Sequence, residues 1–220
     1  MGTVRAHPSP APRRDLERRH WRQGRRAAGI DEVGRGAWAG PVTVAAVLLP
    51  PQRRITRLRD SKLLRPDVRE HLAARLSAVA DGVGIGHASH HEIDRLGLAA
   101  ALRLAAVRAV TALPLRPEVC LIDGPVNLLA DDPDLAERGA CVVGGDRRCA
   151  SIAAASIVAK VARDALMTAA APRHPAYGFA ANKGYPSPEH RSALGTLGPC
   201  ALHRRSFAPV RAAQQATLTW

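Results

Sequence analysis

Residues 27–36 read Ala27-Ala28-Gly29-Ile30-Asp31-Glu32-Val33-Gly34-Arg35-Gly36, and this stretch decides the fold. Its first seven residues predict a buried β-strand that ends at the glycine-flanked turn. Asp31 and Glu32 lie inside this otherwise apolar strand, where a carboxylate is costly unless it is paired or bound to a metal. Neighbours in a strand point to opposite faces, so both acids cannot be hidden on one face. The stretch therefore predicts a central strand that brings two acids to a site.

The segments that follow predict alternating strands and helices. The expected strands are 41–49, 83–87, 118–122 and 140–143, and the expected helices are 66–80, 89–113, 152–170 and one beginning at Ser187. Ser89 and Glu92 match a capping box, and Pro188 suits a first helical turn. Because strands and helices alternate in mixed order without an internal repeat, we expect one α/β domain with a mixed sheet over residues 27–220.

The composition excludes several classes of protein. At 46% hydrophobic the 220-residue chain is not globally disordered, and no apolar run reaches the roughly 18 residues of a membrane span. Residues 1–26 lack the apolar core of a secretory signal. The four cysteines form no C-x-x-C pair, which disfavours a zinc ribbon or a disulfide scaffold and favours reduced thiols in the cytoplasm.

The net charge of +13 indicates a polyanionic partner. Residues 1–26 hold eight arginines against Asp15 and Glu17, which is +6, so the rest of the chain carries +7. We expect residues 1–26 to form a disordered basic arm that adds to the salt-dependent affinity for nucleic acid.

Two further acids follow predicted strands. Asp123 comes directly after strand 118–122, and Asp146 comes after Gly144-Gly145. Taken alone, each could simply close a turn, since Asp-Gly and Gly-Asp are ordinary turn pairs. Together with Asp31 and Glu32, without a cluster of histidines or cysteines, they favour hard cations such as Mg²⁺ or Mn²⁺. Two such ions would suit phosphodiester cleavage.

Three other segments carry candidate contacts to a substrate. The turn Gly34-Arg35-Gly36 does not match a dinucleotide fingerprint, but its backbone can approach a ligand closely; a plain tight turn is the alternative. Ser156, Lys160 and Arg163 form a polar stripe on helix 152–170, for which a solvated face with a Lys160–Asp164 ion pair is the alternative.

Aromatic residues concentrate in 177–185. Tyr185 beside Lys183-Gly184 could stack on a base or sugar, whereas Phe179 is expected in the core. His203-Arg204-Arg205 is expected to be a solvated surface patch.

In order along the chain, these segments resemble the ribonuclease HII (type 2 ribonuclease H) family over about residues 27–211. The motifs that carry the resemblance are residues 29–36 with Ala39-Gly40-Pro41-Val42, Asp60-Ser61-Lys62-Leu63, Ile122-Asp123-Gly124, Gly145-Asp146, residues 153–164, Lys183-Gly184-Tyr185 and residues 203–210. Any one motif is weak, but the ordered set is highly specific.

The resemblance implies a ribonuclease H-like fold: a central mixed five-stranded sheet flanked by helices, with additional C-terminal helices. It implies a metal-dependent endoribonuclease that hydrolyses RNA in RNA–DNA hybrids and cleaves 5′ of ribonucleotides embedded in duplex DNA. Two ions, Mn²⁺ or Mg²⁺, would serve the reaction, and the products would carry 3′-hydroxyl and 5′-phosphate ends. The protein is expected to be a monomer.

The resemblance also assigns roles to residues. The metal-binding, catalytic carboxylates are Asp31, Glu32, Asp123 and Asp146. The loop that contacts the ribose 2′-hydroxyl is Gly34-Arg35-Gly36, and the tyrosine that senses the junction is Tyr185. Lys62, Ser156 and Lys160 are phosphate contacts. The chain departs from the family's usual pattern at Asn182, at Ala37-Trp38 and around Arg147-Arg148-Cys149.

Two other functions are compatible with the basic surface. A non-catalytic nucleic-acid-binding protein would explain the charge but not the acids in a strand. Another two-metal enzyme, such as a DNA nuclease, is disfavoured by the Gly34-Arg35-Gly36 loop, because the 2′-hydroxyl is what separates RNA from DNA.

Overall fold

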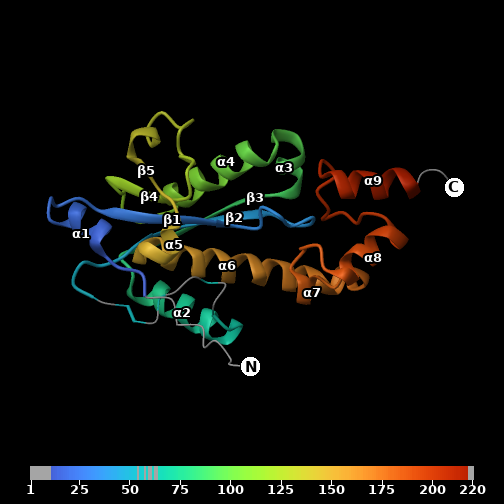
Figure 1. Cartoon of the computed structure of the whole chain (residues 1–220), viewed down its shortest axis with the longest axis horizontal. Coiled ribbons are helices and arrows are strands. Elements are labelled where there is room, and N and C mark those ends of the chain that lie inside the picture. Colours follow the sequence, from blue (N-terminus) through green and yellow to red (C-terminus); the bar gives the residue numbers. More distant parts are fainter. Residues whose placement is uncertain (1–10, 54, 57, 59–60, 62–63, 218–220) are drawn as a thin grey trace, which may run out of the picture.

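One five-stranded sheet lies between two layers of helices in the computed structural model, which describes residues 11–53, 55–56, 58, 61 and 64–217 (Figure 1). The strands are β1 (Ala27–Val33), β2 (Val42–Leu48), β3 (Gly82–Ala88), β4 (Val119–Asp123) and β5 (Gly139–Val142). Their order is β3-β2-β1-β4-β5. The β1–β2 and β2–β3 pairs are antiparallel, whereas β1–β4 and β4–β5 are parallel. The predicted mixed five-stranded sheet is confirmed.

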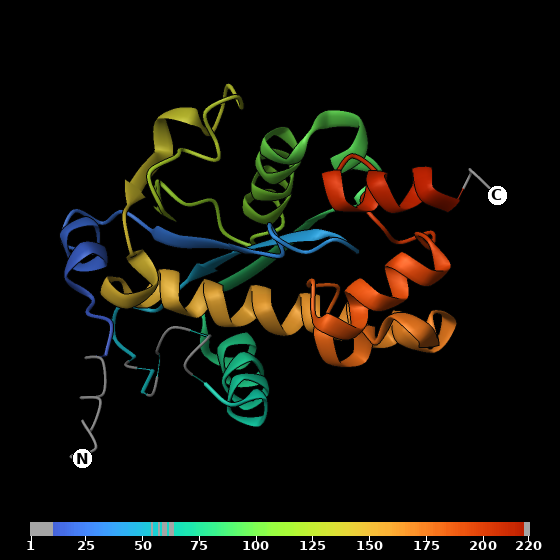
Figure 2. The same ribbon diagram turned by 45° about the vertical axis from the view of Figure 1, so that its right-hand side comes forward.

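Helices cover both faces of this sheet (Figures 1 and 2). The helices between the strands and after them are α2 (Pro66–Val79), α3 (His90–Leu96), α4 (Leu98–Thr111), α5 (Gly145–Arg148) and α6 (Ala150–Ala170). Helix α4 packs on one face, and α6 crosses the other with α2 outside it. Among the described residues, no helix is long and apolar enough to cross a membrane.

The close contact between α6 and β1 depends on Gly29. A Cβ atom at Gly29 would lie 2.1 Å from the main-chain carbon of Ser151. Only glycine allows an approach of this kind without displacing the helix backbone. Alanines on α6, including Ala154 and Ala155, keep the helix close to the sheet along the rest of this interface. Because the small residues let α6 approach β1 closely, Ser156 on α6 can reach Asp31 on β1.

The C-terminal part of the chain forms further helices at one end of the sheet (Figure 1). They are α7 (Phe179–Asn182), α8 (Pro188–Leu197) and α9 (Ala208–Thr217), and single 3₁₀ turns occupy Ala136–Arg138, Ala171–Arg173 and Pro175–Tyr177. Ser187 caps α8 through a 3.2 Å hydrogen bond from the His190 N–H, as predicted. Helix α9 was not predicted from the pattern, although the resemblance implies C-terminal helices.

The single helix predicted over 89–113 is two helices. Ser89 and Glu92 form the predicted capping box at the start of α3. Gly97 then adopts φ 78° and ψ 158°, which ends α3 and begins α4. The apolar spacing continues across this break, so the pattern alone did not reveal it.

The expectation of a disordered arm is wrong for residues 11–26. Asp15–Trp21 forms helix α1, and the Glu17 side chain is fully buried. Its Oε1 atom accepts a hydrogen bond from the Ser151 N–H at 2.7 Å and another from the Cys149 thiol at 3.2 Å. The carboxylate thus satisfies a free N–H in the first turn of α6. Residues 1–10 lie outside the described residues.

Replacing Glu17 with alanine should lower the free energy of unfolding by about 1–3 kcal/mol, because the buried Ser151 N–H loses its partner. Urea unfolding followed by circular dichroism would measure this change. Asp15→Ala is the matched control on the same helix: the Asp15 side chain is 59% exposed, so the loss should stay below about 0.5 kcal/mol. Equal losses in the two variants would contradict a special role for Glu17.

Candidate active site

Asp31 is the buried carboxylate at the centre of the site. It lies one residue beyond Ile30, which pairs with Ile122 on the parallel strand β4. That register brings Asp31 beside Asp123, the last residue of β4. The Glu32 N–H donates to Asp31 Oδ1 at 2.7 Å, and Ser156 of α6 also hydrogen bonds to the carboxylate. Burial raises the pKa of Asp31 well above its usual value, and the charges of Glu32 and Asp123 raise it further.

Asp123 and Asp146 are held together by the turn after β5. The Gly145 N–H donates to Asp123 Oδ1 at 2.6 Å, which fixes the start of α5 against the end of β4. Asp146 follows directly on α5, with a half-buried carboxylate 3.9 Å from Arg147 Nε. Asp123 therefore closes a turn, as in the simpler interpretation, and the turn that it closes brings Asp146 to the same edge.

The donor set fits a hard cation. In the described part of the chain, no group of three or more His, Cys, Asp or Glu side chains has metal-binding geometry as it stands. The Glu32 carboxylate is instead paired with Arg35 at 3.1 Å. However, a buried carboxylate whose neighbours are also acids is stabilised in its charged form by a cation. All four candidate ligands offer carboxylate oxygens, which Mg²⁺ and Mn²⁺ prefer.

The loop after β1 presents its backbone beside these acids. Gly34 has φ +94°, and a Cβ atom there would lie 2.2 Å from Arg163 Nε, so only glycine fits. At Gly36 a Cβ atom would meet nothing within 4 Å, so this part of the loop is open to a ligand. The Arg35 side chain is 60% exposed. The loop is thus packed on one side and accessible on the other.

Two fully buried arginines hold this loop from behind. Arg163 donates to the carbonyls of Pro41, Lys183 and Ala39 at 2.8, 2.9 and 3.1 Å. Arg204 donates to the carbonyls of Gly40, Arg35 and Pro41 at 2.9, 3.0 and 3.0 Å.

The burial of both arginines shows that two predictions of solvent-exposed side chains were wrong. Arg163 is not part of a solvated stripe, and His203 and Arg204 are buried rather than on the surface; of that segment only Arg205 is exposed. Burial lowers the pKa of Arg204 to about 9, with a further contribution from Arg163. Their burial was not predicted because their hydrogen-bond acceptors are main-chain carbonyls of the surrounding loops, which no local sequence pattern reveals.

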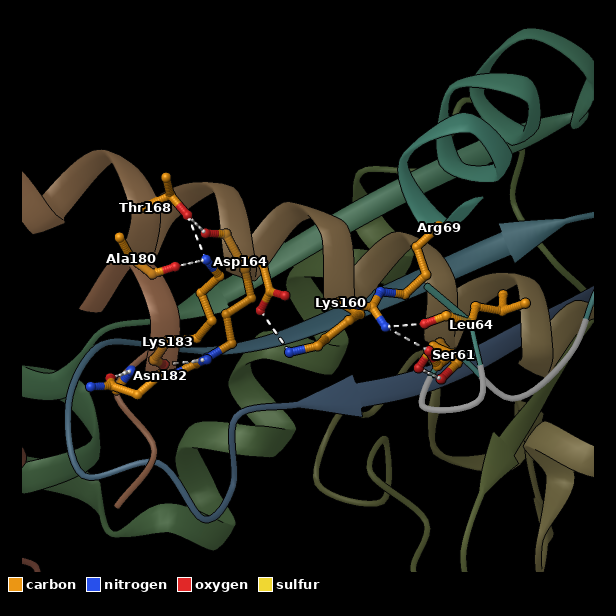
Figure 3. Close-up of polar contacts among 12 residues, drawn as sticks. Ser61, Leu64, Arg69, Lys160, Asp164, Thr168, Ala180, Asn182 and Lys183 are labelled. Carbon is orange, nitrogen blue, oxygen red and sulfur yellow. Dashed lines mark hydrogen bonds and ion pairs between the residues drawn. The ribbon is translucent and has the colours of Figure 1, made fainter. Parts of the chain in front are cut away.

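Two further predicted substrate contacts, Ser156 and Lys160, lie on α6, and Figure 3 shows Lys160 beside Asp164. Ser156 is buried and its hydroxyl lies 2.9 Å from that of Ser61. Lys160 Nζ donates to Asp164 at 2.8 Å, so the ion pair of the alternative interpretation is present. Lys160 also lies over the Tyr185 ring, 5.7 Å from its centroid. Lys62 lies outside the described residues.

Arg69 of α2 is a supporting residue that the sequence did not point to. Its Nη1 atom donates to the carbonyls of Ser61 and Leu64 at 3.0 and 2.7 Å (Figure 3). It thereby fixes the Ser61 main chain next to Ser156. An arginine on an exposed helix face gives no signal in the sequence that would distinguish this role.

The loop that carries Tyr185 is fixed by two departures from the family's usual pattern. Lys183 has φ +52°, the one positive φ among the described non-glycine residues. Asn182 supports this turn, because its Oδ1 accepts from the Gly184 N–H at 2.8 Å and its Nδ2 donates to the Tyr177 carbonyl at 2.7 Å. The Trp38 N–H donates to the Gly184 carbonyl at 2.8 Å. Asn182 thus holds the turn before Tyr185 from within, and the main-chain N–H of Trp38 joins that turn to the loop after β1.

A mixed sheet of this order, with acids on β1, at the end of β4 and on α5 after β5, is the arrangement expected of a nuclease with the ribonuclease H-like fold. Comparison with known proteins gives the family. Residues 28–210 match the family model "Ribonuclease HII". The chain is 54% identical over 192 residues to ribonuclease HII of Moorella thermoacetica, covering 87% of this chain and 91% of that protein. The chain therefore belongs to the ribonuclease HII family, as the motifs indicated.

Solved structures agree on the fold. The crystal structure of ribonuclease H2 from Pyrococcus horikoshii OT3 superposes with a TM-score of 0.73 at 24% identity, covering 89% of this chain and 100% of that one. The structure of Bst-RNase HIII in complex with Mn²⁺ gives a TM-score of 0.63 at 21% identity, covering 87% of this chain and 70% of that one. The fold class predicted from the sequence is confirmed.

The buried Asp31 carboxylate gives a prediction for the metal-free protein. Because its pKa is raised in the folded state, its favourable contribution is present below the unfolded value near pH 4 and is lost as the pH rises. Asp31→Asn removes this titration, so it should raise the free energy of unfolding at pH 7.

Urea unfolding of metal-free protein between pH 5 and pH 8 would test this expectation. The advantage of Asp31→Asn over the unsubstituted protein should widen as the pH rises. Asp67→Asn, whose side chain is 63% exposed, serves as the control and should show no such trend. An Asp31→Asn variant that is less stable throughout this range would contradict the prediction.

Proposed function

We propose that this member of the ribonuclease HII family hydrolyses the RNA strand of RNA–DNA hybrids and cleaves 5′ of ribonucleotides embedded in duplex DNA, leaving 3′-hydroxyl and 5′-phosphate ends. The observation that carries the proposal is the position of the buried Asp31 carboxylate beside the accessible backbone of Gly34-Arg35-Gly36. Acids able to hold cations and a loop able to contact a ribose therefore share one edge of the sheet. Nucleic acid is the partner that the net positive charge favours.

Asp31, Glu32, Asp123 and Asp146 are the proposed ligands of two Mg²⁺ or Mn²⁺ ions. When bound, such ions activate water and stabilise the leaving oxygen of a phosphodiester. Two features of the chain prepare the ligands for this role. Ser156 and the Glu32 N–H orient the Asp31 carboxylate, and the Gly145 N–H orients that of Asp123. Glu32 would exchange its contact with Arg35 for a cation, which would release Arg35 toward a phosphate.

Recognition of RNA is proposed to rest on the backbone of Gly34-Arg35-Gly36 and on the ring of Tyr185. The open side of the loop at Gly36 leaves room for a ribose 2′-hydroxyl, the group that distinguishes RNA from DNA. The ring of Tyr185 is half-buried with Lys160 and Arg163 over it, which leaves part of it for stacking on a sugar. Ser156, Lys160 and Lys62 are the proposed phosphate contacts. We further propose that the protein acts as a monomer in the cytoplasm.

Asp31→Asn should lower kcat on a duplex with a single ribonucleotide by at least about 10³-fold, or about 4 kcal/mol, because the central metal ligand is lost. Affinity for the duplex should remain within about threefold, since the basic surface is unchanged. Gel analysis of a labelled duplex in a Mg²⁺ and Mn²⁺ series, with identification of product ends, would measure both. Asp131→Asn, an exposed acid paired with Arg103, should keep full activity.

Retained turnover in Asp31→Asn would rule out the assignment of the site. Binding that ignores divalent cations and leaves the substrate intact would favour a non-catalytic binding protein. Cleavage of an all-DNA duplex at a similar rate would favour a DNA nuclease.

Tyr185→Ala should lower the preference for a ribonucleotide-containing duplex over the same all-DNA duplex by about tenfold, which is the loss of about 1.4 kcal/mol of stacking. Affinity for the all-DNA duplex should change by less than about twofold. The preference is measured as kcat/KM on the first duplex relative to the association constant for the second. Tyr185→Phe keeps the ring and is expected to keep the preference. An equal loss on both duplexes would show that Tyr185 only packs.

A further inference from the structure

His190 and His203 form a buried, hydrogen-bonded pair behind the Tyr185 loop. His190 is fully buried on α8, and His203 is 1% exposed on the segment before α9. Their Nε2 atoms lie 2.9 Å apart. His190 Nδ1 lies 2.8 Å from the Tyr185 carbonyl, and His203 Nδ1 is 3.0 Å from the Cys200 main-chain nitrogen. The proposed catalytic residues do not include either histidine.

The three contacts determine where the protons lie. A carbonyl only accepts, so His190 Nδ1 must carry a hydrogen and donate it to Tyr185. A main-chain N–H only donates, so His203 Nδ1 must be the acceptor for Cys200. With one hydrogen on each neutral ring, His203 Nε2 then donates to His190 Nε2. One chain of donors therefore runs from Cys200 through His203 and His190 to Tyr185.

The surroundings keep both rings neutral. Burial lowers the pKa of His190, and burial together with the charge of His190 lowers that of His203 to about 4. The Tyr177 ring packs on His203 with the ring centroids 4.9 Å apart, and Phe179 packs on His190 at 5.4 Å. The titratable groups that face the pair are Tyr177, Cys200, His174 and His90. None of these is a carboxylate that would favour an imidazolium.

The pair joins the two elements proposed to read the ribonucleotide. On one side His190 holds the Tyr185 carbonyl, which also accepts from the Ser187 N–H at 2.8 Å. On the other side His203 is followed directly by Arg204, whose guanidinium holds the Arg35 carbonyl. The two imidazoles therefore link Tyr185 to the segment that carries Arg204, in addition to the Arg163 and Trp38 hydrogen bonds that already join the two loops.

We propose that His190 is a positioning residue for ribonucleotide recognition: it fixes the Tyr185 main chain relative to the Gly34-Arg35-Gly36 loop, and the hydrogen bond from His203 favours the His190 tautomer that donates to Tyr185. This inference rests on the proposed function. Neither histidine touches substrate. Their effect is on the preference for a ribonucleotide-containing duplex over the all-DNA duplex.

Two substitutions of His190 separate this role from packing. Asparagine places an N–H near the position of Nδ1, so His190→Asn retains a donor for Tyr185 and loses the contact with His203. Glutamine reaches the position of Nε2, so His190→Gln retains an acceptor for His203 and loses the contact with Tyr185. We expect His190→Gln to lower the preference by about tenfold and His190→Asn to stay within about threefold. His87→Gln, a change to a half-buried histidine bonded to Thr43, should alter nothing.

A second measurement does not depend on activity. Imidazole ¹⁵N shifts of the metal-free protein at pH 7 should show His190 protonated on Nδ1 and His203 on Nε2. In His203→Leu the Tyr185 carbonyl still requires a donor at His190 Nδ1, so His190 should keep this tautomer and the preference should fall less than in His190→Gln. Melting temperatures of all variants identify any effect that is only loss of stability.

The possible outcomes distinguish the inference from the proposed function. If Tyr185→Ala loses the preference and His190→Gln keeps it, the positioning role is wrong and the function stands. Equal losses in His190→Asn and His190→Gln, in step with their melting temperatures, would show that the pair only packs. An unsubstituted protein that cleaves no ribonucleotide-containing duplex would overturn both.

Discussion

Two guanidinium groups in the interior, at Arg163 and Arg204, are the constraint on which the proposed active site depends. A buried arginine is costly unless its donors are satisfied, and here main-chain carbonyls satisfy them rather than acids. The carbonyls belong to residues 35–41 and to Lys183, which are far apart in the sequence. Because each guanidinium is a rigid planar fork, it fixes the relative positions of the segments that it bonds.

The use of carbonyls also leaves the acids at the sheet edge free of these buried cations. Asp31 receives hydrogen bonds from neutral groups, and Asp123 receives one from the Gly145 N–H. An arginine directly on these carboxylates would lower their pKa and compete with a metal. The protein therefore holds its loops with buried positive charge while keeping negative charge available a short distance away. Of the four acids, Glu32 is paired with Arg35 and Asp146 lies 3.9 Å from Arg147 Nε, and both arginines are largely exposed.

The sequence predicted the regular parts of the molecule well because their signals are local. Strand β1, the capping box at Ser89 and the start of α8 each follow from spacing or from one residue type. The break at Gly97 was missed because the apolar spacing continues through it. The burial of Arg163 and Arg204 was missed because their acceptors are main-chain atoms, which every residue carries. Glu17 was missed for a related reason: its partner is an N–H at the start of a helix more than a hundred residues away.

The contact between Glu17 and Ser151 spans 134 positions, and this separation has a consequence for how the chain folds. Helix α1 leaves the ribosome long before α6 exists, so its acid has no N–H to bind until most of the sheet has been synthesised. A short helix with one buried side chain has little stability alone. We therefore expect α1 to dock last, after α6 has packed across β1, and to open first when the native protein fluctuates. Protection of the α1 amides from hydrogen exchange would therefore show that folding is complete.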